Sequence, residues 1–234
     1  MNASTEPPIE ITAFSWVPDF AKGYVRCLRP RWALEEIGLP YRTRLFHAAE
    51  PRPADYFLEQ PFGQVPAYRE GDLHMFESGA ILLHIGEKDE RLLPRNPQRR
   101  ARSMSWLLAA FNSVEPSVME LVSVNLFNAN EDWAPLRRPS AMDAARAKLS
   151  RVADSLGDRE WLEDRFTVAD IAMVTVLRGL DHTELLSEFP SLVAYRARGE
   201  ERPAFARAYR SQLSDFDTGS GQSMEKTAAG GGAS

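Results

Sequence analysis

Two short stretches of the chain combine residue types that could bind a peptide. Phe62-Gly63-Gln64-Val65-Pro66 is the first, and Glu77-Ser78 follows eleven residues after Pro66. Because proline has no N–H, Pro66 suits the first residue of a strand, in a turn where the preceding peptide bond can be cis. The backbone N–H and C=O of Val65 would then face solvent, where an extended ligand peptide can pair with them.

Glu77 and Ser78 supply complementary polar groups at the start of a predicted helix. The free amides and the positive dipole end of that helix favour a carboxylate beside Ser78, and the Glu77 carboxylate can bind an ammonium group. Together with Val65, these groups predict a receptor for a small peptide with an α-amino acid terminus. The alternative interpretation is structural, because Ser78 also suits a plain helix N-cap and Val65-Pro66 an ordinary strand entrance.

A predicted β-hairpin brings the two stretches together. Residues 65–69 and 73–76 have the pattern of strands, and Glu70-Gly71-Asp72 between them has the composition of a tight turn. With Gly71 at the centre of that turn, Val65 is expected to lie opposite Glu77 at one strand spacing.

The remaining N-terminal elements place this hairpin in an α/β domain. Alternating apolar residues predict strands, apolar residues at helical spacing predict helices, and Gly38 stands where a helix C-cap belongs. The strand-helix-strand order favours a parallel crossover, so we expect a mixed four-stranded sheet. These further elements are strands at 9–15 and 39–46 and helices at 24–37 and 78–86.

The rest of the chain has long helical patterns and no further strand signal, which predicts an all-α bundle. Thr167 and Asp170 have the spacing of a capping box, with Asp in place of the usual Glu or Gln. The charged, proline-containing segment 87–97 is the expected linker, and a disordered tail is expected at 218–234. The predicted domains are thus 1–86 and 98–217, with helices in the second at 99–119, 141–156, 166–180, 190–199 and 203–213.

Composition argues against several classes of partner. The 234 residues include 28 basic and 33 acidic side chains, a net charge of −5, so no basic field would gather nucleic acid. The longest uninterrupted apolar stretches are far shorter than the roughly 18 residues that a membrane helix needs. The N-terminus lacks the basic-then-apolar pattern of a signal peptide, which predicts a cytoplasmic protein.

The cysteine and histidine content argues against a metal site. Cys27 is the only cysteine, which excludes disulfide frameworks, and the four histidines show no metal-ligand spacing. Without a partner cysteine, Cys27 is expected to be a small buried hydrophobe. Arg26, Arg29 and Arg31 on the first predicted helix are expected to form a solvated basic face.

Several motifs give the chain a resemblance to a known family. Over roughly residues 9–213 the sequence resembles the glutathione transferase superfamily, bacterial in type and of no assigned class. The resemblance implies a thioredoxin-like N-terminal domain that holds glutathione, followed by an all-helical domain. The motifs are Trp32-Ala33-Leu34-Glu35-Glu36-Ile37-Gly38-Leu39-Pro40-Tyr41, residues 62–66, 76–83 and 166–176, and Arg202-Pro203-Ala204-Phe205.

The resemblance assigns roles to the two peptide-binding stretches. Val65 would pair its backbone with the cysteinyl part of glutathione, beside a cis Pro66. Gln64 would help to hold the ligand, while Glu77 and Ser78 would hold its γ-glutamyl end. The family also implies a homodimer, glutathione as co-substrate without a metal or redox cofactor, an apolar electrophile as second substrate, and a role in detoxification.

In such enzymes the residue that activates the glutathione thiol lies between the first strand and the first helix. A Ser, Tyr or Cys there donates a hydrogen bond that lowers the thiol pKa below about 8.5 and favours the nucleophilic thiolate. Counting from the predicted strand points to Ser15. Counting back from Arg31-Trp32 points near Tyr24, and both residues remain open.

Three functions fit these residues. The first is an enzyme that adds glutathione to an apolar electrophile. The second uses glutathione catalytically and releases it, as in the isomerisation of a conjugated diketo acid or in reductive dehalogenation. The third is a binding protein that keeps the fold without turnover.

Overall fold

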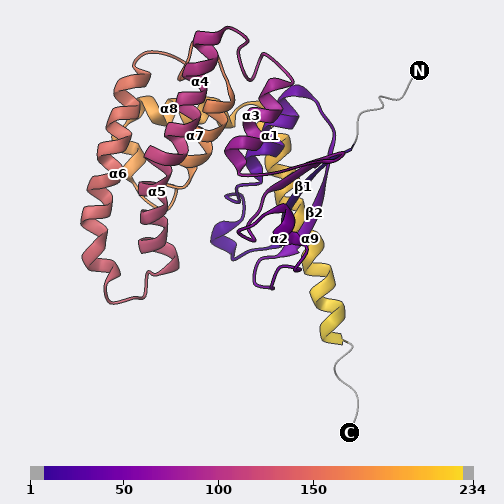
Figure 1. The fold of residues 1–234 in the computed structure, drawn as a ribbon. Coiled ribbons are helices and arrows are strands. Elements are labelled where there is room, and N and C mark those ends of the chain that lie inside the picture. The colour runs from indigo at the N-terminus through magenta and orange to yellow at the C-terminus, as the bar shows by residue number, and fades with distance from the viewer. Residues whose placement is uncertain (1–7, 229–234) are drawn as a thin grey trace. The chain divides into compact units, whose positions relative to one another are not determined.

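The chain folds as two compact units in the computed structural model, which describes residues 8–228 and side chains up to residue 217 (Figure 1). The first unit contains the described residues up to Ile81 and again from Ala206. The second unit is continuous from Leu82 to Phe205. The C-terminal helix α9 (Pro203–Ala228) therefore belongs almost wholly to the first unit.

A four-stranded mixed sheet forms the centre of the first unit, which confirms the predicted thioredoxin-like α/β fold class. The strand order is β2-β1-β3-β4, with β1 and β2 parallel and the other two pairs antiparallel. Alternate residues Ile9, Ile11 and Ala13 are buried, as the apolar alternation of this segment predicts. The strands are β1 (Ile9–Trp16), β2 (Tyr41–His47), β3 (Ala67–Glu70) and β4 (Leu73–Phe76).

The register of the β3–β4 hairpin differs by one residue from the prediction. The two strands pair end to end, which leaves Gly71-Asp72 as a two-residue turn instead of a turn centred on Gly71. Two-residue loops are the commonest hairpin connections, and Gly71 has the positive φ (58°) that they require. Continued by one residue, the observed register places Pro66 opposite Glu77, so the predicted pairing of Glu77 with Val65 is wrong.

Two helices of the first unit precede the hairpin, and a third, which continues into the second unit, follows it directly. Helix α1 (Leu28–Ile37) starts later than predicted, because residues 24–27 form hydrogen-bonded turns. Gly38 ends α1 in the left-handed conformation with φ 74°, as predicted. A short helix, α2 (Tyr56–Glu59), precedes the hairpin, and α3 (Ser78–Glu87) starts at Ser78.

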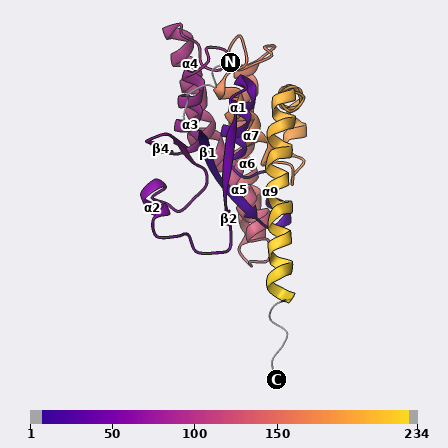
Figure 2. The same cartoon turned by 90° about the vertical axis from the view of Figure 1, so that its right-hand side faces the viewer.

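Helix α9 completes the first unit. It lies beside α1 and β2 (Figure 2), where the Ser211 hydroxyl accepts hydrogen bonds from Arg31 Nη1 (2.8 Å) and from the Tyr41 hydroxyl (3.3 Å). The thioredoxin-like unit is thus built from both ends of the described chain.

The second unit has helices and no strand within residues 82–205, which confirms the predicted all-α part. Two π-helical segments interrupt the helical stretch that starts at Pro97, and this stretch lies antiparallel to α6 in Figure 1. Helix α7 is buried almost all round, as its apolar sequence predicts. The elements are α4 (Pro97–Ala109), η2 (Ala110–Val114), α5 (Glu115–Val122), η3 (Ser123–Phe127), α6 (Ala134–Leu156), α7 (Val168–Arg178), η4 (Leu185–Glu188) and α8 (Pro190–Glu200).

The predicted capping box at the start of α7 is confirmed. The Thr167 N–H donates to Asp170 Oδ2 (2.8 Å), and Thr167 Oγ1 accepts from the Ala169 N–H (3.2 Å). Asp170 Oδ1 also accepts from the Leu162 N–H (3.0 Å) and the Tyr195 hydroxyl (2.9 Å). Burial raises the pKa of Asp170 to about 6, although these donors favour its charged form. One carboxylate therefore joins α7 to the preceding loop and to α8.

Two segments outside the predicted domains have defined backbone structure. The expected linker at 87–97 belongs to the second unit, where the Leu92 carbonyl accepts from the Val168 N–H (2.9 Å) and the Leu92 and Leu93 side chains are buried. Helix α9 continues to Ala228, so the stretch 218–228, expected to be disordered, is helical. No proline interrupts α9 after Pro203. The rest of the expected tail, 229–234, lies outside the described residues, and the boundaries 1–86 and 98–217 stay a prediction.

One helical stretch of the described residues, Pro97–Phe127, is long and apolar enough to cross a membrane by length and composition alone. The prediction from uninterrupted apolar runs missed it, because an 18-residue window can reach this mean hydropathy with up to two charged residues. Of that window, 39% is buried within the structure. Core helices of soluble proteins meet the same criterion, so this helix is weak evidence for a membrane span.

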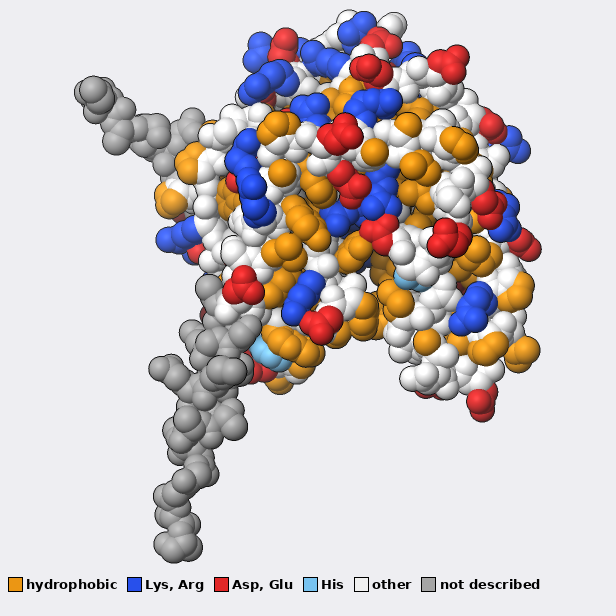
Figure 3. Space-filling model, turned by 180° about the vertical axis from the view of Figure 1, so that it is seen from behind, with side chains coloured by type: hydrophobic (Ala, Val, Ile, Leu, Met, Phe, Trp, Pro, Cys, Tyr) orange, Lys and Arg blue, Asp and Glu red, His pale blue; other side chains and the backbone are white. Residues whose placement is uncertain are grey.

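Charged side chains of both signs are interspersed on the face shown in Figure 3, and apolar side chains lie between them. The mixture agrees with a composition that has only five more acidic than basic side chains.

Candidate active site

The Val65-Pro66 stretch enters β3 through a cis peptide bond. Within the described residues, neither the N–H nor the C=O of Val65 has a hydrogen-bond partner. Only 7% of Val65 is exposed, so the residue is largely enclosed. Nearly all buried backbone polar groups in proteins are paired, which makes an unpaired N–H and C=O on one residue a binding feature for an extended ligand.

A directional series of hydrogen bonds fixes the segment on both sides of Val65. The Ala67 N–H donates to Thr12 Oγ1 (2.6 Å), and the Tyr56 hydroxyl donates to the Gln64 carbonyl (2.5 Å). Thr12 Oγ1 and Tyr56 Oη are 2.8 Å apart. Since the one Tyr56 proton is directed at Gln64, the Thr12 hydroxyl must donate to Tyr56. Each of the two hydroxyls donates once and accepts once, and neither backbone group of Val65 takes part in the series.

Gln60, directly after α2, holds the preceding loop. Its buried Oε1 accepts from the N–H groups of Phe62 (2.7 Å) and Gln64 (3.2 Å). Both backbone groups of Gln64 are therefore paired, whereas its side chain is exposed. The sequence prediction missed Thr12, Tyr56 and Gln60. No local signal identified them, because Thr12 lies on the same strand face as the charged Glu10.

Ser78 lies at the N-terminus of α3 with a buried arginine against it. Arg29 Nη1 donates to Ser78 Oγ (3.1 Å), and only 4% of Arg29 is exposed. The predicted solvated basic face is therefore wrong for Arg29, and also for Arg31, which is buried and ion-paired with Asp215. Because Ser78 Oγ accepts from the guanidinium, its own proton is available to donate, and a cation lies beside it.

Glu77 has backbone strain directly before this helix. Its φ is 68°, and it is the one non-glycine residue with positive φ in the part of the chain that the structure describes. A left-handed conformation costs an L-residue about 1–2 kcal/mol. The Glu77 side chain is exposed, and its carbonyl accepts from the Ile81 N–H (3.0 Å). Strain of this kind often occurs at functional sites, where the geometry matters more than its cost.

The two residues considered for thiol activation differ in their surroundings. Ser15 lies at the irregularity in β1–β2 pairing between Phe14 and Trp16, and its hydroxyl donates to the Phe46 carbonyl at a long 3.4 Å. Tyr24 lies in the loop before α1 and is 42% exposed.

Cys27 is buried at the N-terminus of α1, as expected. Burial raises the pKa of its thiol, which disfavours the reactive thiolate.

Aromatic and basic side chains continue the surface next to Ser15. The Trp16 and His47 rings stack with centroids 4.7 Å apart. Arg52 donates to the carbonyls of His47 (2.9 Å) and Glu50 (2.7 Å), and its guanidinium lies over the Phe14 ring. These contacts hold His47 at the end of β2 and fix the loop that follows it.

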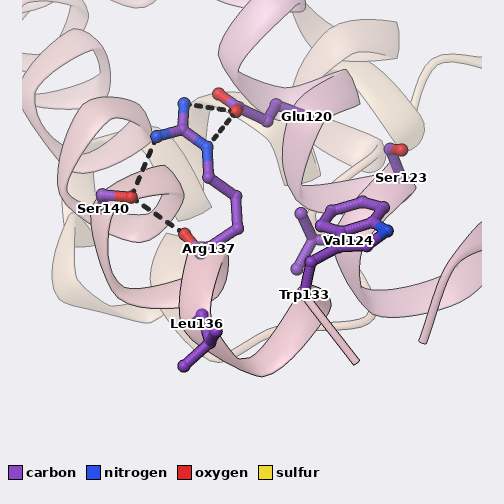
Figure 4. A pocket seen from close by; sticks show the side chains of 7 residues that line it. All are labelled: Glu120, Ser123, Val124, Trp133, Leu136, Arg137 and Ser140. Atoms are coloured by element: carbon purple, nitrogen blue, oxygen red, sulfur yellow. Dashed lines mark hydrogen bonds and ion pairs between the residues drawn. The ribbon is translucent and has the colours of Figure 1, made fainter. Parts of the chain in front are cut away.

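The second unit has a cavity of about 590 Å³ between α5, η3 and α6 (Figure 4). The Trp133 indole and the Val124 and Leu136 side chains form its apolar part. On the other side, Arg137 donates to Glu120 Oε1 (2.7 Å) and to Ser140 Oγ (3.0 Å).

Among the described residues, no group of three or more His, Cys, Asp or Glu side chains could hold a metal ion.

Comparisons with known proteins identify the family of this chain. The glutathione S-transferase N-terminal domain matches residues 19–87, and the C-terminal domain of the same family matches residues 114–203. A glutathione S-transferase of Hyoscyamus muticus is 31% identical over 178 residues, covering 69% of this chain and 79% of the relative. The chain belongs to the glutathione transferase superfamily. Another relative in the comparison, the disulfide-bond oxidoreductase YfcG of Escherichia coli strain K12, is 27% identical over 199 residues, covering 78% of this chain and 89% of YfcG.

Solved structures share the glutathione transferase fold with this chain. A glutathione transferase of Pseudomonas putida, with one glutathione disulfide bound per subunit, has a TM-score of 0.75 at 21% identity and covers 88% of this chain and 93% of its own. Ure2p in complex with glutathione also has a TM-score of 0.75 at 21% identity, covering 87% of this chain and 93% of its own. At these identities the likeness is one of fold.

Proposed function

We propose that this member of the superfamily binds glutathione and activates its thiol for attack on an apolar electrophile. The observation that carries the proposal is the unpaired N–H and C=O of Val65, fixed at its neighbours and lying beside a cis proline. An extended cysteinyl residue offers the matching C=O and N–H.

The γ-glutamyl end of glutathione fits the groups around α3. Its α-carboxylate would accept hydrogen bonds from the Ser78 hydroxyl and from the first amides of α3, with the Arg29 charge beside them. Its ammonium group would meet the Glu77 carboxylate, and the exposed Gln64 side chain would contact the peptide beside Val65.

The bound thiol reacts as its thiolate. A hydroxyl that donates to the sulfur lowers the thiol pKa, and the proton leaves to solvent. The sulfur then forms a bond to the electrophilic carbon, and the leaving group departs with the electrons of the broken bond. We take Tyr24 as this donor, because 42% of the residue is exposed, whereas the Ser15 hydroxyl donates to the Phe46 carbonyl of β2.

The proposal is tested by calorimetric titration with reduced glutathione, followed by turnover of a chloronitrobenzene electrophile. Binding with turnover is the expected result. Binding without turnover would favour a glutathione-dependent isomerase or dehalogenase, or a ligand-binding protein with this fold. No binding at millimolar glutathione would overturn the site.

Phenylalanine in place of Tyr24 is expected to lower kcat about 10- to 100-fold, since a hydrogen bond to a charged group contributes about 1.5–3 kcal/mol. For the same reason the pKa of bound glutathione, read from thiolate absorbance, is expected to rise by about 1–2 units. Ser15→Ala is the matched comparison and should leave both values near those of the wild type. The reverse pattern would make Ser15 the residue that activates the glutathione thiol.

Glycine in place of Glu77 is expected to stabilise the fold by up to about 1 kcal/mol, because relief of the left-handed conformation exceeds the entropy cost of glycine. The same variant should bind glutathione about 2- to 5-fold more weakly, as an exposed ion pair contributes up to about 1 kcal/mol. Urea unfolding and calorimetry measure the two effects. Glu77→Gln, which keeps the strain and removes the charge, should show only the loss of binding; unchanged binding in both variants would remove Glu77 from the site.

A homodimer, a cytoplasmic location and a role in detoxification complete the proposal. Apolar side chains on the first unit support an interface, because Leu58 is 88% exposed and Phe62 is 67% exposed. Analytical ultracentrifugation would give twice the chain mass if the homodimer forms.

A further inference from the structure

The residue before Tyr24 lies directly against helix α9. Gly23 has φ +84°, and a Cβ atom at this position would be 2.6 Å from Cε2 and 2.8 Å from Oη of Tyr209. Any larger residue would collide with the ring as well as being strained, so the loop backbone packs closely on Tyr209. A side chain of α9 thus packs against the loop backbone at Gly23.

The residue after Tyr24 is tied to the same helix. Gln212 is 1% exposed, and its Nε2 donates to the Val25 carbonyl (2.9 Å) and to Cys27 Sγ (3.0 Å). A carbonyl acceptor requires a donor, which fixes the orientation of the Gln212 amide. One carboxamide therefore joins the loop to the start of α1.

Helix α9 is itself anchored to α1 by hydrogen bonds and ion pairs. Arg31, which is fully buried in α1, donates to Ser211 (2.8 Å) and is ion-paired with Asp215. At the other end of α1, Arg207 donates to Glu35 Oε2 (2.7 Å). Gln212 lies between these anchor points on α9.

We propose that α9 is a positioning element for thiol activation: Tyr209 and Gln212 fix the backbone on both sides of Tyr24 and so hold its hydroxyl at the glutathione sulfur. This inference rests on the proposed function. The groups that would touch glutathione come from β3, α3 and the residues before them, and Arg29 of α1 is held by Ser78. A change at Gln212 should therefore affect kcat and not affinity.

The test is Gln212→Met, which keeps the length and apolar volume of the side chain and removes both hydrogen bonds. We expect kcat to fall about 10-fold, because small displacements of a catalytic group reduce rates steeply. The acid limb of the pH–rate profile should move to higher pH, with the Kd for glutathione unchanged. Ser214→Ala removes an exposed hydroxyl of α9 that donates only to the Ser211 carbonyl, and should change none of these values.

A double-variant cycle separates positioning through Tyr24 from a general loss of structure. If Gln212 acts through Tyr24, Tyr24→Phe/Gln212→Met should have the kcat of Tyr24→Phe alone, whereas additive losses would overturn the inference. So would a wild-type kcat and pH profile in Gln212→Met. If that variant does not fold by circular dichroism, Tyr209→Leu tests the contact at Gly23 with Gln212 in place. Failure of the wild-type protein to bind glutathione would instead overturn the proposed function.

Discussion

Alanine in place of Ser78 is expected to weaken glutathione binding about 5- to 150-fold, or about 1–3 kcal/mol. The substitution removes a donor to the ligand carboxylate. It also leaves a buried Arg29 N–H without the acceptor that it contacts at 3.1 Å. Because both effects act at one end of the ligand, the loss should appear in the Kd from calorimetry and leave kcat at saturating glutathione nearly unchanged.

A glutathione analogue without the α-carboxylate tests whether Ser78 binds that group. Glutathione in which the γ-glutamyl group is replaced by 4-aminobutyryl lacks the α-carboxylate, and the wild type and the Ser78→Ala variant should bind it equally. Ser105→Ala removes an exposed hydroxyl that donates within α4 and should bind glutathione as the wild type does. Equal loss for glutathione and for the analogue would show that Ser78 supports the fold of the site and not the carboxylate.

Alanine in place of Asp170 is expected to lower the free energy of unfolding by about 3–4 kcal/mol. The change leaves the N–H groups of Leu162 and Thr167 and the Tyr195 hydroxyl without their shared acceptor. Each unpaired buried donor costs about 1–3 kcal/mol. Urea denaturation followed by circular dichroism measures the loss.

Asp164→Ala is the matched control for Asp170, since its exposed carboxylate makes an ion pair with Arg99 (3.1 Å) at the surface. That variant should lose at most about 1 kcal/mol. Equal effects of the two substitutions would mean that the Asp170 network contributes no more than a surface pair.

Local signals predicted much of the fold. Gly38 ends α1, Ser78 starts α3 and Thr167 with Asp170 starts α7, because each of these positions needs a residue type that few others can replace. The apolar alternation from Ile9 predicted β1, because alternate residues of a strand lie on the same face. The resemblance to the family then directed attention to Val65 and its neighbours.

The missed features depend on residues that are distant in sequence. Arg29 and Arg31 appear as a solvated face of a helix, but partners 49 and 184 residues away make them buried groups. Thr12 and Tyr56 similarly acquire their role only when β1, α2 and β3 meet. The predicted hairpin register was wrong by one residue. The strand pattern is compatible with a turn centred on Gly71 and with a two-residue turn at Gly71-Asp72, and only the observed pairing distinguishes the two.

The two-ended construction of the thioredoxin-like unit limits how this chain can be recombined with its relatives. A chimera that joins an N-terminal segment ending at Ile81 to another protein's helical part would have to take residues from Ala206 onward from the same parent. A mismatched pair of ends would place foreign side chains against Arg31, Glu35 and Gly23. The segment to exchange between relatives is therefore the internal one, Leu82–Phe205, with both flanking segments kept from one parent.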